Sequence, residues 1–236
     1  MPTISVVMPA HDEEDFLGPA VREVTTGLRE RGREFDVLVV ENGSTDGTAA
    51  LARQLAEELP EVRTVSLPEP DYGGALRTGV MTAGGDLVVI FDVDYFDLEF
   101  LDRALARMEE ADRPAIVVGS KRAPGAQDAR PWARRLVTSG FSTILRFGFG
   151  LAVSDTHGMK VLRRAAVAEL ADGCRYGTDL FDTELVLRVE RAGLRAVEIP
   201  VAVEERRPSR SSIVSRIPRT VAGLVRLRLA LWRERL

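Results

Sequence analysis

Residues 86–94 read Asp-Leu-Val-Val-Ile-Phe-Asp-Val-Asp, an apolar run that ends in two carboxylates one residue apart. The apolar part predicts a buried strand, and the carboxylates would stand where that strand stops. In open α/β sheets the ligand crevice lies at the carboxyl ends of the strands. Asp92 and Asp94 could therefore hold a divalent cation, Mg²⁺ or Mn²⁺, because both ions accept hard oxygen ligands. The alternative is a solvated turn rich in aspartate.

Strand and helix patterns alternate through the first half of the chain. Apolar runs predict strands at 4–8, 35–40, 62–67, 87–91 and 115–119, and amphipathic runs predict helices at 13–31, 48–58, 73–83 and 98–111. The alternation predicts an α/β fold, a mostly parallel sheet with helices on both faces. The second half is less regular. Strands are expected at 159–162 and at 196–203, the latter broken by Pro200, and helices at 136–154, 182–193 and 217–236.

Composition narrows the class of protein. The 236 residues suffice for one substantial domain, and the net charge of −4 argues against a nucleic-acid partner. One cysteine excludes an internal disulfide and fits a reducing compartment. The N-terminus has no signal-peptide pattern, and no apolar stretch reaches the ~20 residues of a membrane span.

Charge is unevenly distributed along the chain. Residues 205–236 contain nine Arg and two Glu. We therefore expect a domain at 1–204, followed at 205–236 by a basic loop and a C-terminal amphipathic helix. Such a helix can lie on an anionic membrane, or it can dock on this domain or on a partner subunit of a homo-oligomer.

The turns after the first two strands carry further polar side chains. The first turn reads Pro9-Ala10-His11-Asp12-Glu13-Glu14, where Asp12 is expected to cap the next helix and Glu13 to contact a ligand. The second turn runs from Glu41 to Thr48, and Glu41 or Asn42 could read the edge of a nucleobase. Asp46 and Thr48 are expected to cap the helix that follows.

The order of these motifs resembles that of the family-2 glycosyltransferases. It comprises a strand followed by Pro-Ala-x-x-Glu-Glu, a strand followed by x-x-Gly-Ser-Thr-Asp-Gly-Thr, a Gly-Gly-Ala-x-x-x-Gly loop at 73–79, and a strand followed by Asp-x-Asp. The resemblance implies a GT-A fold and inverting transfer from a nucleotide-sugar donor. It also implies metal binding by Asp92 and Asp94 and donor contacts from Pro9, Ala10, Glu13, Glu41, Asn42, Gly74, Arg77, Asp92 and Val93.

The second half resembles the dolichol-phosphate mannose synthase branch, which transfers a hexose to a polyprenyl phosphate. The matching segments are 119–122, 154–160, 181–184 and 207–212. The resemblance implies that a late basic loop closes over the donor diphosphate through Arg207, Ser209 and Arg210. It further implies acceptor contacts from Lys121, Arg122, Asp155 and Lys160, and catalytic or acceptor-orienting roles for Asp94, Asp182, Glu184 and Arg207.

Three features depart from that branch. Phe96 stands where a Gln usually follows the Asp-x-Asp motif, and Asp97 could substitute for it one residue later. Glu41-Asn42 replaces the commoner Asp-Asp, and the tail has no membrane-spanning segment of the kind that some members carry.

The sequence thus predicts a metal-dependent inverting hexosyltransferase at the cytoplasmic membrane face, cytoplasmic or peripherally bound. The donor would be a GDP- or UDP-sugar and the acceptor a polyprenyl phosphate. The alternatives are transfer to a soluble hydroxyl acceptor or glycan, a catalytically silent nucleotide-sugar-binding module, and a nucleotidyltransferase. The nucleobase, the sugar and the oligomeric state do not follow from the sequence.

Overall fold

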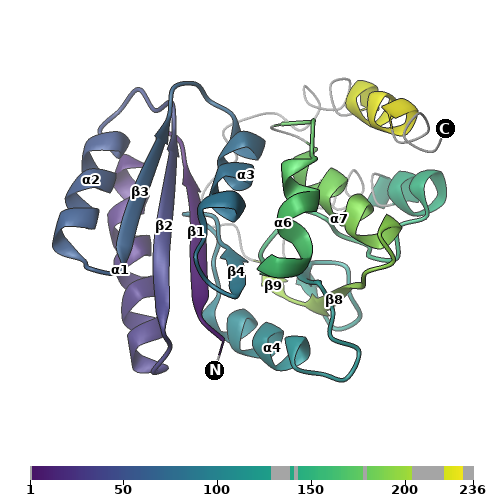
Figure 1. The fold of residues 1–236 in the computed structure, drawn as a ribbon, viewed down its shortest axis with the longest axis horizontal. Coiled ribbons are helices and arrows are strands. Elements are labelled where there is room, and N and C mark those ends of the chain that lie inside the picture. Colours follow the sequence, from purple (N-terminus) through teal and green to yellow (C-terminus); the bar gives the residue numbers. More distant parts are fainter. Residues whose placement is uncertain (1, 129–138, 141–142, 178–179, 204–220, 231–236) are drawn as a thin grey trace.

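The computed structural model describes residues 2–128, 139–140, 143–177, 180–203 and 221–230 (Figure 1). Its strands are β1 (Ile4–Ala10), β2 (Phe35–Asn42), β3 (Val62–Leu67), β4 (Leu87–Ile90), β5 (Ile116–Ser120), β6 (Gln127–Asp128), β7 (Lys160–Arg163), β8 (Ala196–Pro200) and β9 (Ala202–Val203). Its helices are α1 (Glu14–Glu30), α2 (Thr48–Glu58), α3 (Tyr72–Thr82), α4 (Leu98–Met108), η1 (Leu145–Phe149), α6 (Arg164–Asp172) and α7 (Phe181–Arg191). Residues 221–230 are also helical.

The main sheet has seven strands in the order β3-β2-β1-β4-β7-β5-β8. All neighbouring pairs are parallel except those of β7, which runs antiparallel to both β4 and β5. After β1 the chain builds β2 and β3 on one side and then returns to place β4 on the other. A reversal of this kind opens a ligand crevice at the carboxyl ends of the two strands. The predicted α/β fold is confirmed.

Helices cover both faces of the sheet because its strands are apolar on both sides. In β1, Val6 and Met8 belong to the core cluster that contains α1, α2 and α4, whereas Val7 belongs to the cluster that contains α3, α6 and α7. Figure 1 shows α1 and α2 on one side of the sheet and α3 on the other. Central parallel strands buried on both faces are expected to read as continuous apolar runs.

The structure gives more detail for two segments of the second half. The strand expected at 196–203 breaks after Pro200, as expected: β8 ends there and pairs with β5, and β9 pairs with β6 in a separate two-stranded sheet. The helix expected at 136–154 ends as the π-helix η1, since Gly150 adopts a left-handed conformation with φ of 75°. Among the described residues, no helix combines the length and apolar character needed to span a bilayer.

The contact of α3 with β1 predicts a loss of stability on substitution of Gly79 by Ala. A Cβ atom at Gly79 would overlap with Val7 Cγ1 and lie 3.0 Å from Val7 Cγ2. We expect Gly79→Ala to lower the free energy of unfolding, measured by urea denaturation, by about 1–3 kcal/mol. In the control, Gly18→Ala in α1, the new Cβ would meet only ordinary contacts at 3.8 Å or more, so stability should stay equal or rise by up to about 1 kcal/mol. Equal stability of the two variants would contradict the close approach of α3 to the sheet.

Candidate active site

The candidate site lies at the carboxyl edge of the sheet, where the chain leaves β1, β2 and β4. Pro9 and Ala10 end β1, and Ala10 lies opposite Glu41 in the register of β2. Asn42 ends β2, and Asp92 follows β4 by two residues. Because β1 pairs in parallel with β2 and with β4, the three strand ends meet at one edge. The structure therefore brings these sequence-predicted residues together.

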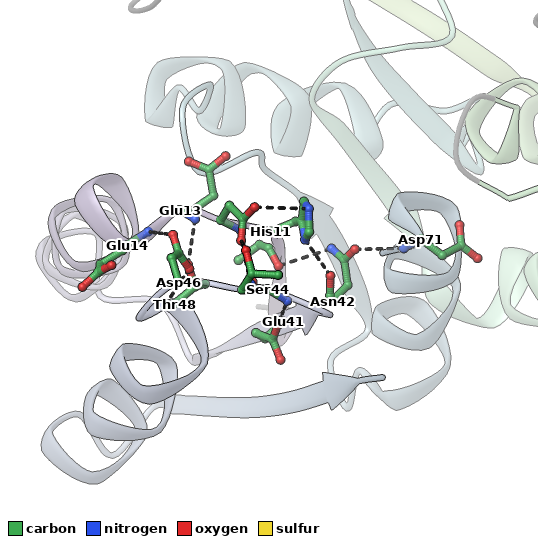
Figure 2. A network of polar contacts seen from close by, with 12 residues as sticks. His11, Glu13, Glu14, Glu41, Asn42, Ser44, Asp46, Thr48 and Asp71 are labelled. Carbon is green, nitrogen blue, oxygen red and sulfur yellow. Dashed lines mark hydrogen bonds and ion pairs between the residues drawn. The ribbon is translucent and has the colours of Figure 1, made fainter. Parts of the chain in front are cut away.

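The first two loops are joined by helix caps that they share (Figure 2). The Asp46 carboxylate accepts a hydrogen bond from Glu14 N at 3.3 Å and another from Thr48 N at 2.9 Å, so that one side chain caps both α1 and α2. In return, Glu14 Oε2 accepts from Gly47 N at 3.0 Å, and Thr48 Oγ1 accepts from Glu13 N at 2.7 Å. These reciprocal caps satisfy the otherwise unpaired N–H groups of both helices and fix one loop against the other.

The expectation that Asp12 caps the first helix is wrong. Asp12 has a left-handed backbone with φ of 52° and accepts a hydrogen bond from Thr45 N at 2.8 Å. This backbone hydrogen bond lowers the pKa of Asp12, because it stabilises the ionised carboxylate. The capping groups of α1 come from a segment more than 30 residues later in the chain, so local sequence patterns did not reveal them.

Glu41 and Asn42 are buried at the end of β2 and support the loops around them. Glu41 Oε1 accepts from Ser44 N at 2.6 Å. The Asn42 amide donates to Ala10 O at 3.3 Å and accepts from Asp71 N at 3.0 Å, so both ends of the amide hold backbone. The Glu13 carboxylate points away from this network, as Figure 2 shows, although Glu13 is only 8% exposed.

A tight turn positions the Asp-x-Asp motif. Asp92 and Tyr95 exchange two backbone hydrogen bonds, of 3.2 and 3.1 Å, which close the turn around Val93 and Asp94. Phe96 leaves the turn and enters the core, where its ring centroid lies 6.1 Å from that of Phe91.

Phe96 and Asp97, which follow the motif, have roles in the fold, and a part for Asp97 in a metal site stays a prediction. Phe96 is buried among apolar side chains. Asp97 is the N-cap of α4 and accepts from Glu99 N at 2.7 Å.

Negative charge is concentrated around Asp92. Its carboxylate accepts a hydrogen bond from the Tyr72 hydroxyl at 2.8 Å. Burial raises the pKa of Asp92 to about 6, the Tyr72 hydrogen bond opposes the rise, and the nearby charges of Asp94 and Asp182 add to it. Burial, together with the charge of Asp92, raises the pKa of Tyr72 as well, so the phenol remains a hydrogen-bond donor at neutral pH.

Lys160 is fully buried and pairs with Asp182. The Nζ atom lies 2.9 Å from Asp182 Oδ1 and donates to Gly158 O at 2.8 Å. The Lys160 side chain is 1% exposed and that of Asp182 is 5% exposed. Buried charges need partners of this kind, because desolvation of an unpaired ion is costly. These contacts give Lys160 a charge-pairing role inside the fold, and its expected contact with an acceptor stays a prediction.

Glu184 has both carboxylate oxygens engaged inside the protein. Oε2 accepts from the backbone N atoms of Arg175 and Tyr176, each at 2.9 Å. Oε1 lies 2.9 Å from Nε and 2.8 Å from a terminal guanidinium nitrogen of Arg188. Glu184 is fully buried, so these contacts favour a structural role that holds the segment before α7.

Lys121 and Asp155 lie beside the Asp-x-Asp turn. The Lys121 Nζ atom stands 5.5 Å from the centre of the Tyr95 ring, which places a cation at the turn. Asp155 is buried and accepts from His157 N at 3.0 Å and from Lys121 N at 3.4 Å. The Arg122 side chain is directed elsewhere and donates to Ser139 Oγ at 2.6 Å.

The glycine loop at 73–79 packs against neighbouring segments of the chain, and its cation, Arg77, is paired away from the Asp-x-Asp turn. Arg77 forms an ion pair with Asp172 at 2.6 Å, with both side chains well exposed. A Cβ at Gly73 would lie 2.6 Å from the backbone of Gly177, and one at Gly74 would lie 2.5 Å from Asp71 Oδ2. Close packing against backbone therefore requires a glycine at position 73, whereas at Gly74 the Asp71 side chain would have to shift. Arg207, Ser209 and Arg210, predicted to bind the diphosphate, lie outside the described residues.

Comparison with known proteins identifies the family. The profile of glycosyl transferase family 2 matches residues 5–171. The chain belongs to glycosyl transferase family 2. It is 32% identical over 211 residues to an uncharacterised glycosyltransferase of Mycobacterium tuberculosis, with 89% of each chain covered. It is also 32% identical over 215 residues to the undecaprenyl-phosphate mannosyltransferase of Micrococcus luteus, with 86% of this chain and 84% of that protein covered.

Solved structures agree on the fold. The glucosyl-3-phosphoglycerate synthase of Mycobacterium tuberculosis, in complex with Mn²⁺, UDP and phosphoglyceric acid, superposes with a TM-score of 0.69 at 23% identity, covering 96% of this chain and 78% of that one. A mannosyltransferase from Pyrobaculum calidifontis, in complex with GDP-Man and Mn²⁺, gives a TM-score of 0.64 at 23% identity, covering 92% and 61%. The predicted GT-A glycosyltransferase fold is confirmed, and the protein is a glycosyltransferase.

The family-2 motifs did not reveal Tyr72 as a partner of Asp92. Tyr72 is the first residue of α3 and stands directly before the two glycines, which was the signal available in the sequence. The partner of Lys160 was likewise hidden, since Asp182 lies 22 residues later on another element.

The buried pair in this transferase predicts a large cost for removing one partner. Lys160→Met should lower the free energy of unfolding by about 3–5 kcal/mol, because it leaves the Asp182 carboxylate buried without its counter-charge. The double variant Lys160→Met/Asp182→Leu should recover much of that loss, which a double-mutant cycle in urea would measure. The matched control is Arg77→Met, which breaks an exposed pair and should cost at most about 1 kcal/mol. Equal effects of the two single variants would contradict the paired charge inside the fold.

Proposed function

We propose that this family-2 glycosyltransferase moves a hexose from a nucleoside-diphosphate sugar to a polyprenyl phosphate, with inversion and with the help of a divalent cation. The observation that carries the choice of acceptor is the engagement of Asp182 and Glu184, two carboxylates for which a catalytic or acceptor-orienting role was expected. Asp182 is paired with Lys160, and Glu184 receives four hydrogen bonds or ionic contacts from its own protein.

The state of these carboxylates bears on the nucleophile. A hydroxyl acceptor must lose a proton as it attacks, so it needs a base within hydrogen-bond reach. A phosphate monoester is already an anion at neutral pH and attacks without such help. Because Asp182 and Glu184 both contact other groups of the protein, the arrangement favours an acceptor whose nucleophilic oxygen is already negatively charged.

At the donor end, the residues fit a divalent cation. Asp92 and Asp94 offer oxygen ligands one residue apart, and burial, with the charges of Asp94 and Asp182, raises the pKa of Asp92. Among the described residues, no three acidic, histidine or cysteine side chains form a complete metal site. Mg²⁺-type sites commonly use one or two carboxylates together with substrate phosphates, which suits a diphosphate donor. Bound there, the cation would supply Lewis-acid stabilisation of the leaving diphosphate.

The chain's own residues would orient the donor. The loops after β1 and β2 are fixed against each other by their shared helix caps. From these loops, Glu13 and Glu41 would contact the base or the ribose of the donor nucleotide. Tyr72 donates to Asp92 and holds that carboxylate in one orientation. Lys121, over the Tyr95 ring, places positive charge beside the turn. Such preorganised groups stabilise developing charge without rearranging during the reaction.

The relatives support the same acceptor class. The Micrococcus luteus relative is named an undecaprenyl-phosphate mannosyltransferase, and a relative in Saccharomyces cerevisiae, 25% identical over 249 residues, is named a dolichyl-phosphate beta-glucosyltransferase. Both names specify a sugar transferred to a polyprenyl-type phosphate. The complex with phosphoglyceric acid belongs to a more distant neighbour, so a soluble acceptor is the outcome against which the proposal is tested.

The donor site predicts nucleotide binding that depends on metal and on Asp94. In calorimetry with GDP, UDP and their sugars plus Mn²⁺, we expect one nucleotide to bind and a chelator to abolish or greatly weaken it. Asp94→Ala should remove the metal dependence and reduce transfer by about 10²–10³-fold, as expected when one contact that stabilises developing charge is lost. The control is Asp102→Ala, an exposed aspartate on α4 paired with Arg31, which should leave both properties unchanged. Full activity of Asp94→Ala would overturn the metal assignment.

The acceptor proposal predicts a strict requirement for the lipid phosphate. The assay uses the nucleotide sugar that the calorimetry selects as the donor. We expect transfer in detergent to a short-chain polyprenyl phosphate and none to the matching polyprenol, which presents a hydroxyl in place of the phosphate. Product formation would be followed with a radiolabelled sugar. Transfer to 3-phosphoglycerate or to the polyprenol at an equal or higher rate would overturn the proposal and favour a hydroxyl acceptor.

A further inference from the structure

The helix at 221–230 has two apolar faces. Leu224 and Leu227 are buried in the same core cluster as α3, α6 and α7. A Cβ at Gly223 would overlap with Leu180 Cδ1, so the helix is packed closely on the domain. On the other side, Val221, Val225 and Leu229 are 46%, 55% and 51% exposed, a group that we call the outer stripe. One face of the helix thus docks on this domain, which is one of the possibilities that the sequence left open. The outer stripe on the other face is exposed.

The geometry of the helix separates the outer stripe from the docked face. With 3.6 residues per turn, positions 221, 225 and 229 fall within an arc of about 80°. Leu227 lies about 160° from Val225, whereas Leu224 lies about 60° from Val221, so the docked face begins beyond one edge of the stripe. Arg226 and Arg228 flank the outer stripe on its two edges, and both are exposed. The Arg228 guanidinium lies 5.7 Å from the centre of the Phe149 ring, which ties this helix to η1.

The neighbouring helical segment adds exposed apolar side chains. Phe147 in η1 is 83% exposed, and Ile144 just before it is 47% exposed. Figure 1 shows the 221–230 helix beside the helical segment that ends in η1, in agreement with the Arg228–Phe149 contact. Single exposed apolar residues need no explanation, but a regular stripe next to an exposed Phe marks an interaction surface.

We infer that the outer stripe docks on the surface of an anionic lipid bilayer. The argument for this occupant is charge complementarity. The sequence of 221–230 is Val-Ala-Gly-Leu-Val-Arg-Leu-Arg-Leu-Ala, with two cations and no acid, in a chain whose net charge is −4. An apolar stripe between arginines is the pattern of helices that lie in the membrane interface, where the side chains of Arg reach the anionic headgroups.

The inference rests on the proposed function for its biological purpose, since a polyprenyl phosphate resides in a bilayer. It adds to that function the surface by which the enzyme reaches its acceptor. The two can fail separately, because vesicle binding needs no donor and transfer to a short-chain acceptor in detergent needs no bilayer.

The test is co-sedimentation of the full chain with vesicles of phosphatidylcholine alone or of phosphatidylcholine mixed with phosphatidylglycerol. We expect binding to the mixed vesicles and weak or no binding to the neutral ones. Val225→Ser/Leu229→Ser should reduce the partition coefficient about tenfold or more, since buried apolar area contributes to interfacial binding. Arg226→Gln should reduce it roughly fivefold, the effect of one cation near an anionic surface.

Matched controls lie on other parts of the molecule. Leu194→Ser changes an exposed Leu after α7, and Arg53→Gln changes an exposed Arg on α2, and neither should alter vesicle binding. Val225→Ser/Leu229→Ser should keep its rate on the short-chain acceptor in detergent, which shows that the variant is folded, and lose rate on acceptor embedded in vesicles. Binding that is equal for neutral and anionic vesicles, or unchanged in the stripe variant, would overturn the inference. So would sedimentation equilibrium showing that the stripe variant converts a dimer into a monomer, because the outer stripe would then be covered by a second copy of the chain.

Discussion

Accumulated negative charge at the carboxyl end of β4 is the constraint on which the rest of the site depends. Burial and the charges of Asp94 and Asp182 raise the pKa of Asp92 to about 6, while Lys160 and the Tyr72 hydroxyl oppose that rise. Lys160 is already paired with Asp182 at 2.9 Å. A cluster of this kind is stabilised by an added cation, and a divalent ion that also contacts a diphosphate would complete the charge balance.

The direction of β7 places the counter-charge, Lys160, beside these carboxylates. β7 runs antiparallel to β4, and Lys160 at its start lies opposite Ile90 at the end of β4. A parallel strand would place its own end there, with its start at the opposite edge of the sheet. The antiparallel insertion also delivers the preceding loop, with Asp155 and its contact to Lys121 N, to the same edge. One reversed strand therefore supplies the buried counter-charge and brings Asp155 to the same edge of the sheet.

Local patterns predicted the elements well, because apolar runs and turn residues act within a few positions of the chain. The alternation in the first half, the strand end at Asp92 and the meeting of three loops all followed from such patterns. Contacts across many residues did not follow. Asp12 was expected as a cap, yet Asp46 caps α1 from 32 residues away. The pairing of Lys160 with Asp182 on α7 was not predicted either. A sequence shows that a charge is present but does not show which opposite charge will be folded against it.

The anchoring of the last described helix connects the proposed membrane surface with the site. Gly223 packs against Leu180, and Leu180 stands two residues before Asp182, the partner of Lys160. Leu224 and Leu227 share their core cluster with α3, which begins at Tyr72. Because close-packed cores are hardly compressible, elements that share a core keep fixed positions relative to one another. A bilayer bound to the outer stripe of this helix would therefore lie at a fixed place relative to the carboxylates.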